Sequence, residues 1–189
     1  YSVAGYQKEV KEITISDYVF GGRFVSAVTS IGDSAFSGCT SLTSIVIPDS
    51  VTSICSFAFY NCTSLTSVVI PDSVTSISSS AFSGCSSLTE ISIPDNVTSV
   101  GEKLLQGCSS LKTINIGKCL ETIPEYGTGK CLFGLEKTNT KSAYSLESYS
   151  VDNENPYFKS IGGVLCKKEA FGEETFTVEV IDAPVNNLL

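Results

Sequence analysis

The feature that most constrains this chain is a 23-residue repeat that runs through its middle. Cysteines fall at positions 39, 62, 85 and 108, and the same step relates the apolar residues around them. Eight apolar positions keep the step through four copies, and Leu42, Ile45 and Ile47 are three of them in one copy. A fixed period of this length is typical of proteins built from stacked units.

One unit, CTSLTSIVIPDSVTSICSFAFYN, predicts a strand, a turn, an irregular return and a short helical turn. Ile45 and Ile47 lie two residues apart, as on one face of a strand. Pro48-Asp49 ends the strand, because Pro cannot donate to a ladder and Asp favours turns. Residues 34–38 have room for one helical turn before Cys39.

A single unit buries too little to fold alone. Six large apolar side chains contribute roughly 9–18 kcal/mol of gross burial, whereas ordering a unit costs on the order of 35 kcal/mol. Units must therefore stack on one another, and a constant period predicts parallel strands in register. We predict an α/β solenoid with a parallel β-sheet on one face and short helical turns opposite.

We expect one domain over residues 1–189, with regular repeats at about 28–123. Strand patterns at Val10–Ile15 and Leu146–Val151 extend the array to six strand-bearing units, and Cys131 continues the cysteine ladder by the same step. Insertions then fall at about 16–27 and 132–145. The tail, 152–189, is predicted to be a β-rich cap, with a hairpin turn in 160–165 and a strand in 175–181.

The repeats resemble a known family. AVTSIGDSAFSGCTSLTSIVIPD (27–49) and SVTSISSSAFSGCSSLTEISIPD (73–95) are similar to the BspA-type, or Treponema-type, leucine-rich repeat of bacterial surface proteins. Segment 151–165 resembles an insert common in that family. The resemblance covers 28–123 strongly, and 10–27 and 146–166 weakly. It implies a leucine-rich-repeat solenoid in a secreted or cell-surface protein, and some members bind host matrix or plasma proteins. The usual handedness of crossovers between parallel strands predicts that the solenoid is right-handed.

Composition excludes several function classes. With 12 Lys and Arg against 20 Asp and Glu, the net charge of −8 argues against nucleic acid and anionic membranes as partners. No run of about 18 apolar residues is present, so we expect no membrane insertion. The chain has no His, which removes Ser-His-Asp and Cys-His catalysis and His metal ligands. We therefore expect no enzyme and no cofactor.

The cysteine ladder has three interpretations: a metal site, disulfides or buried core thiols. No C-x₂-C pair is present, and stacked side chains with parallel Cβ vectors are awkward to bridge. We favour small buried thiols. Cys55 should lie on the convex side, and a Cys119–Cys131 bridge is a further alternative. The redox states of Cys119, Cys131 and Cys166 stay open.

Asp49, Asp72 and Asp95 recur at one position of the repeat, and Lys118 takes the next place. Stacked carboxylates are ligands for Ca²⁺, but Asp at such positions more often closes Asx turns. We favour the turn interpretation. In it, Lys118 relieves the repulsion at the end of the row.

The outward positions of the strands are the first candidate binding surface, on the predicted concave face. They are Ser44, Val46, Ser67, Val69, Glu90, Ser92, Thr113 and Asn115. A small, nearly neutral, flat surface suits an adaptable protein contact better than catalysis, which needs converging polar groups. A solvated sheet with no ligand is the alternative.

The insertions supply a second set of candidates. Tyr18, Phe20 and Phe24 cluster in the first insertion, and aromatic residues on a loop serve as interface anchors. They equally suit packing over the open end of the core, as do Phe133 and Tyr144. Charge is uneven as well: residues 24–102 hold six acidic residues and no Lys or Arg. Such a patch steers basic partners or is simply a solvated face.

The family resemblance, together with a strand surface that lacks catalytic groups, implies a non-catalytic secreted or cell-surface module that binds a protein ligand, such as a host matrix or plasma protein. The alternative is a structural spacer within a larger surface protein. The oligomeric state, the identity of the ligand and the anchoring mode stay open.

Overall fold

The structure of the chain is a computed structural model, which describes residues 10–21, 24–126, 131–133, 135, 145–171 and 175–182. These ranges form sixteen β-strands and contain no helix. The strands are β1 Glu12–Thr14, β2 Tyr18–Gly21, β3 Phe24–Ala27, β4 Ser30–Ile31, β5 Ser44–Val46, β6 Ser53–Ile54, β7 Ser67–Val69, β8 Ser76–Ile77, β9 Glu90–Ile93, β10 Thr113–Ile116, β11 Glu125–Tyr126, β12 Cys131–Leu132, β13 Ser148–Val151, β14 Phe158–Ile161, β15 Val164–Phe171 and β16 Thr175–Asp182.

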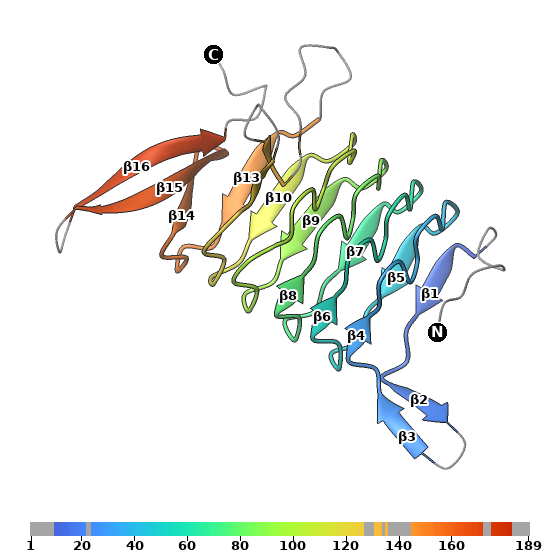
Figure 1. Cartoon of the computed structure of the whole chain (residues 1–189). Coiled ribbons are helices and arrows are strands. Elements are labelled where there is room, and N and C mark those ends of the chain that lie inside the picture. The colour runs from blue at the N-terminus through green and yellow to red at the C-terminus, as the bar shows by residue number, and fades with distance from the viewer. Residues whose placement is uncertain are drawn as a thin grey trace.

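Six strands, β1, β5, β7, β9, β10 and β13, stand in one row along the molecule (Figure 1). β1, β5 and β7 pair in parallel, as do β9, β10 and β13. Ile45 lies opposite Val68, and Ile91 lies opposite Ile114, so the register steps by the repeat length. The predicted parallel pairing is confirmed.

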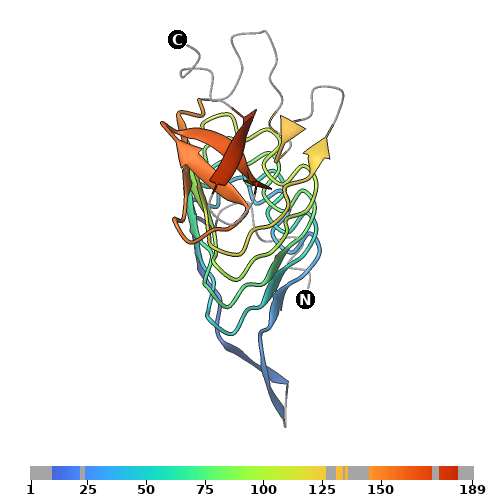
Figure 2. The same cartoon turned by 90° about the vertical axis from the view of Figure 1, so that its left-hand side faces the viewer.

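A second, narrower parallel sheet, β4-β6-β8, faces the first across the core. Ile31, Ile54 and Ile77 are successive partners in it, and an isolated bridge continues the line from Ile77 to Val100. Seen end-on, the repeats lie one behind another between these two walls (Figure 2). The sequence predicted this stretch only as an irregular return.

The predicted short helical turns, and with them the α/β class, are not confirmed, because the described residues are all-β and turn. In one repeat, the backbone N–H groups of Ser34, Phe36 and Gly38 donate to the carbonyls of Ser56, Ala58 and Tyr60 in the next repeat. An α-helix would need these same N–H groups for its own i−4 carbonyls. Backbone hydrogen bonds between neighbouring repeats therefore take the place of the hydrogen bonds within a helix.

Two left-handed positions per repeat also interrupt any helix in this segment. The first is held by Ser34, Phe57, Ser80 and Lys103, with φ between 54° and 58°. The second is held by Gly38, Asn61, Gly84 and Gly107, with φ between 56° and 79°. The second position could be read from the sequence, since it is Gly or Asn in every copy.

The core is a continuous column of apolar residues from successive repeats. Phe36, Phe59 and Phe82 stack with ring centroids 5.3 and 5.1 Å apart and planes within 6°. Leu42, Leu65, Leu88 and Leu111 are fully buried beside them. This column supplies the burial that a single repeat lacks.

The many hydroxyls of the chain, 30 Ser and 17 Thr, follow the same period. The hydroxyl of Thr66 donates to the Thr43 carbonyl at 3.2 Å, and that of Thr89 to the Thr66 carbonyl at 3.4 Å. Thr75 bonds Thr52 in the same way at 3.3 Å on the second sheet. These side chains give backbone carbonyls between repeats an additional donor.

An antiparallel sheet, β14-β15-β16, follows the last strand of the row. Gly162 and Gly163, both with positive φ, make the two-residue turn between β14 and β15, as the sequence predicted. Phe158 and Leu165 reach into the core. The predicted β-rich C-terminal element is present at this end of the row (Figure 1).

Asn155 fixes this sheet to the array. It is fully buried, and its Nδ2 donates to the carbonyls of Gly117 at 2.8 Å and Leu120 at 3.2 Å. Its Oδ1 accepts the N–H groups of Tyr157 and Phe158, both at 2.8 Å. Every hydrogen-bonding atom of the amide contacts either the last repeat or the start of β14.

The cysteine ladder does not continue at Cys131, contrary to the sequence prediction. Cys131 lies in β12, where it pairs with Tyr126. Phe133 comes two residues later, and its carbonyl accepts the N–H of Leu105 at 2.8 Å, just as the carbonyl of Ala81 accepts the N–H of Phe59. Phe133 therefore holds the repeat position of Ala81. Because Cys85 lies four residues after Ala81, the next ladder position falls four residues after Phe133, whereas Cys131 precedes Phe133. Phe133 itself is fully buried, whereas Tyr144 lies outside the described residues.

Candidate protein-interaction face

The eight predicted surface residues lie at the outward positions of the strand row, and we call them the strand face: Ser44, Val46, Ser67, Val69, Glu90, Ser92, Thr113 and Asn115. The residues between them point into the core, as the burial alternation of β9 and β10 shows. Val46 and Val69 expose 57% and 77% of their surface. The structure thus brings all eight onto one surface.

The strand face changes character along its length. It is apolar around Val46 and Val69, which are neighbours in register. Further along, Nδ2 of Asn115 donates to Oε1 of Glu90 at 2.6 Å and to Oγ of Ser92 at 3.0 Å. The polar half is therefore pre-arranged by its own hydrogen bonds, while the apolar half is open to solvent.

Sequence reasoning missed the ends of this surface. Glu12 and Thr14 of β1 lie opposite Ser44 and Val46. At the other end, Ser148 and Ser150 of β13 lie opposite Thr113 and Asn115. The signal was available, because both flanking strands had been located by their apolar pattern, and their outward positions follow from it.

A shallow groove of about 470 Å³ adjoins the strand face at the carboxyl ends of β9, β10 and β13. Ser92 and Asn115 of the strand face line it, together with Asp72, Asp95 and Asp152. Within the described ranges, no three Asp, Glu or Cys side chains form a group suited to a metal ion.

The Asp row behaves as a set of turn residues. Each turn closes through main-chain atoms, with Val51 donating to Pro48, Val74 to Pro71 and Val97 to Pro94, at 3.0–3.2 Å. The turn is confirmed, although its closing bond is not the Asx type.

Lys118 ends the row as predicted. Its Nζ lies 3.7 Å from Oδ2 of Asp95 and 3.0 Å from Oε2 of Glu154. The hydrogen bond and charge of Glu154, with Asp95 and Asp152 nearby, raise the pKa of Lys118 above its ordinary value.

The cysteine ladder is part of the core. Cys62, Cys85 and Cys108 are fully buried, and each Sγ donates to a Phe carbonyl of the preceding repeat at 3.1–3.2 Å. Burial raises the pKa of Cys108 to about 12 and raises those of Cys62 and Cys85 further. The core-thiol interpretation is confirmed, and these thiols are poor nucleophiles and ligands.

The cysteines beyond the ladder are also single thiols where their side chains are described. Cys119 is exposed and free, so the Cys119–Cys131 bridge is not formed. Cys55 is half-buried and free, and Cys166 is buried and free. The side chain of Cys131 lies outside the described residues.

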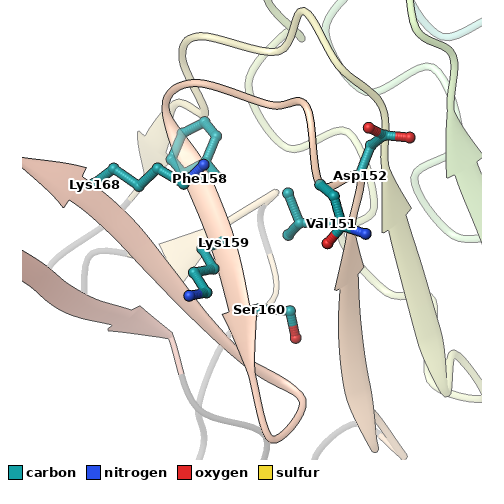
Figure 3. A pocket seen from close by; sticks show the side chains of 7 residues that line it. Val151, Asp152, Phe158, Lys159, Ser160 and Lys168 are labelled. Atoms are coloured by element: carbon teal, nitrogen blue, oxygen red, sulfur yellow. The ribbon is translucent and has the colours of Figure 1, made fainter. Parts of the chain in front are cut away.

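A second hollow, of about 440 Å³, lies between β13 and β14 (Figure 3). Two of its polar side chains already have protein partners. Nζ of Lys168 donates to the carbonyl of Asn155 at 2.5 Å, and Oγ of Ser160 donates to that of Tyr149 at 2.7 Å. Asp152 lies apart from Lys159 and Lys168 (Figure 3). The hollow therefore lacks the converging groups of a catalytic site.

The first insertion is a β-hairpin, β2-β3, that projects away from the array (Figures 1 and 2). Tyr18 exposes 54% and Phe20 82% of its surface, so the interpretation that they pack over the core is wrong. Phe24 begins β3, but its side chain lies outside the described residues, as does Arg23.

Comparison with known proteins identifies the repeat. The model of the family described as "BspA type Leucine rich repeat region" matches residues 12–133 in six copies. The chain belongs to this family. A search of curated proteins finds no significant match. No helix able to span a membrane occurs in the part of the chain that the structure describes.

Solved structures of bacterial leucine-rich-repeat proteins share the fold. The Treponema pallidum protein TpLRR is 28% identical with a TM-score of 0.54, and the match covers 58% of this chain and 50% of that one. A Eubacterium ventriosum protein, at 23% identity and a TM-score of 0.62, matches 86% of this chain and 37% of its own length. The pneumococcal vaccine antigen PcpA, at 20% identity and a TM-score of 0.54, matches 86% and 45%.

The chain therefore spans half or less of the length of each of these three structures. It is a leucine-rich-repeat module of the BspA type.

Proposed function

We propose that this module is a non-catalytic, secreted or cell-surface protein-binding unit, and that the strand face contacts the partner. The observation that carries the proposal is a continuous outward band across six parallel strands, with an open apolar half and a pre-arranged polar half. A host matrix or plasma protein is the class of ligand we propose, on the family resemblance.

Two properties support binding over catalysis. The exposed valines, Val46 and Val69, sit side by side in the apolar half of the band, and exposed apolar neighbours of this kind suit the core of a protein interface. Around them the polar groups are spread along the strands, with no pocket that gathers a nucleophile, a base and an oxyanion donor.

Charge favours a partner with a basic contact surface. Residues 24–102 carry six acidic residues and no cation, and Glu90 is exposed on the strand face itself. A surface of one sign raises the association rate of partners with the opposite sign and makes that rate sensitive to salt.

The experiment is a binding assay of the whole chain against immobilised matrix and plasma proteins. Val69→Glu places a charge at the centre of the strand face and should weaken any specific binding by about 10-fold or more. Ser76→Glu is the matched control, because Ser76 is exposed in the same repeat but on the second sheet. The proposal fails if no protein of the panel binds, or if both variants bind equally well.

A spacer within a longer surface protein is the second candidate. It is favoured by the share of the solved relatives that this chain covers, since those chains are longer. A spacer makes no use of the strand face, so Val69→Glu would leave every binding activity of the longer protein unchanged.

A further inference from the structure

The β2-β3 hairpin carries an apolar face that nothing in the described chain covers. Tyr18 pairs with Ala27 and Phe20 with Val25, so these four side chains share one face of the ribbon. Tyr18, Phe20 and Val25 expose 54%, 82% and 60% of their surface, and Ala27 is exposed too. Such clustering differs from the scattered apolar residues of an ordinary surface.

The apolar surface continues from the hairpin to the end of the array. Val19 and Ala27 line an open cavity of about 690 Å³ together with Ile15, Val28 and Phe36 of the first repeat. In the described residues β4 is also the edge strand of its sheet. The hairpin and the cavity together form one patch, which we call the hairpin patch.

A projecting two-stranded hairpin is marginal in water unless its apolar face packs on something. We propose that the hairpin patch is the contact through which two copies of this chain form a two-fold dimer. In it, the face formed by Tyr18, Phe20, Val25 and Ala27 packs on the same face of the second copy. This proposal is independent of the strand face and of its ligand.

Charge points to a second copy over a different partner. Each chain carries a net charge of −8, yet β2 and β3 contain no charged residue. The nearest acidic residues, Asp17 and Asp33, lie at the base of the hairpin and the rim of the cavity. Two copies can therefore meet here without opposing like charges at the centre, which is difficult over the acidic repeats.

Area is sufficient for such a contact. The exposed parts of Tyr18 and Phe20 alone amount to roughly 250–300 Å² per copy. Val25, Ala27 and the cavity rim add to this, so a pair buries on the order of 1,000 Å², at the lower end for a specific interface. A self-complementary apolar face also suits two-fold symmetry, since each residue meets its own equivalent surface.

The test is the mass of the whole chain by size-exclusion chromatography with light scattering, at about 1–100 µM, which brackets a modest dimer affinity. We expect a concentration-dependent rise from the 20.0 kDa monomer towards twice that mass. Phe20→Glu should weaken dimerisation by about 100-fold or more, because the interface would bury an unpaired charge. Phe20→Ala should weaken it less.

Ser76→Glu is the control, since Ser76 is also exposed but lies outside both the hairpin patch and the strand face. It should dimerise normally, and thermal melting should show that all variants are folded. A wild-type chain that stays monomeric throughout overturns the proposal, as does a Phe20→Glu variant that still dimerises. Phe20→Glu should still bind any ligand of the strand face, because Phe20 lies outside that face. Loss of dimerisation with ligand binding intact therefore tests the dimer proposal separately from the strand-face proposal.

Discussion

Gly101 lies directly against the backbone of the preceding repeat. A Cβ placed on it would overlap backbone atoms of Ser78 and Ser79, which have no flexible end to move aside. We expect Gly101→Ala to lower the free energy of unfolding by about 2–4 kcal/mol, through overpacking against backbone. Urea denaturation followed by circular dichroism measures the change.

Gly32 is the control, because it holds the same repeat position at the N-terminal end of the regular array. A Cβ there meets nothing within 4 Å. Gly32→Ala should change the free energy of unfolding by no more than about 0.5 kcal/mol. Equal effects at Gly32 and Gly101 would contradict the close approach of neighbouring repeats.

Single residues were predictable where one rule decided them. Burial of Cys62 and Cys85 followed from their place in an apolar period, and the turn at Gly162 and Gly163 followed from paired glycines. The left-handed backbone of Phe57 could not be predicted, since Phe gives no signal for it and the repeat alone imposes it.

Asn155 is the buried amide that joins the C-terminal sheet to the repeats. Removing it by Asn155→Ala leaves the carbonyls of Gly117 and Leu120 and two backbone N–H groups without this partner. We expect a loss of about 2–4 kcal/mol in the free energy of unfolding. Hydrogen exchange should also rise first in 152–168.

Asn153 offers the control at the element scale. It lies two residues away and is exposed. Asn153→Ala should therefore change the free energy of unfolding by no more than about 0.5 kcal/mol. The hydrogen-exchange rates of 152–168 should stay as in the wild-type chain. If Asn155→Ala behaved like Asn153→Ala, the sheet would be held by other contacts.

The phenylalanine stack allows a second prediction for an element. Phe59 lies between Phe36 and Phe82, whereas Phe36 is at the end of the stack. Phe59→Ala should cost about 3–5 kcal/mol of unfolding free energy, and Phe36→Ala clearly less, because its cavity opens to solvent. Chemical denaturation of the two variants tests the order, and a larger loss for Phe36→Ala would contradict it.

The strands could be predicted within the part of the chain that follows the 23-residue repeat. The strands β5, β7, β9 and β10 follow from apolar alternation alone. The helical turn is not confirmed because repeat-to-repeat hydrogen bonds compete for the same N–H groups, a long-range effect that local propensity does not report. The β2-β3 hairpin was missed because its strands are short and its residues were read as aromatic anchors on a loop, although Gly21-Gly22 in the sequence is a turn signal.

For the whole molecule, the thiol ladder predicts a limit to stability at alkaline pH. Burial raises the pKa of Cys62, Cys85 and Cys108 above the ordinary 9.0, so these thiols stay neutral in the folded state while unfolded thiols ionise. Stability is therefore unaffected well below pH 9 and falls above it, by about 1.4 kcal/mol per thiol and pH unit.

Urea denaturation between about pH 7 and pH 10 measures this slope. Cys85→Ala should reduce the slope by one thiol's share, although it also lowers stability at every pH. Val74→Ala should leave the slope unchanged, because it truncates a buried side chain without removing a thiol. A slope that does not depend on Cys85 would contradict the proposed origin of the effect.

At this scale the sequence predicted the stacking and the family, but not which surface is used. The eight residues of the strand face could be derived from periodicity, because outward positions alternate with core positions, but the outward positions of β1 and β13 were not included. The sequence could not name a ligand for this surface, since small side chains such as Ser67 and Ser92 are compatible with many partners.

The hydrogen bonds between repeats have a consequence for how such a gene can change. The N–H of Ser34 donates to Ser56 in the next repeat, while the N–H of Thr52 donates to Thr29 in the preceding one, so neighbouring repeats share several separate rows of backbone hydrogen bonds. Adding or losing one residue within a regular repeat would change the register of one row relative to the others. Duplication or deletion of a whole unit keeps the register of every row. Recombination between copies can thus lengthen or shorten the protein in whole-unit increments without redesigning its interior.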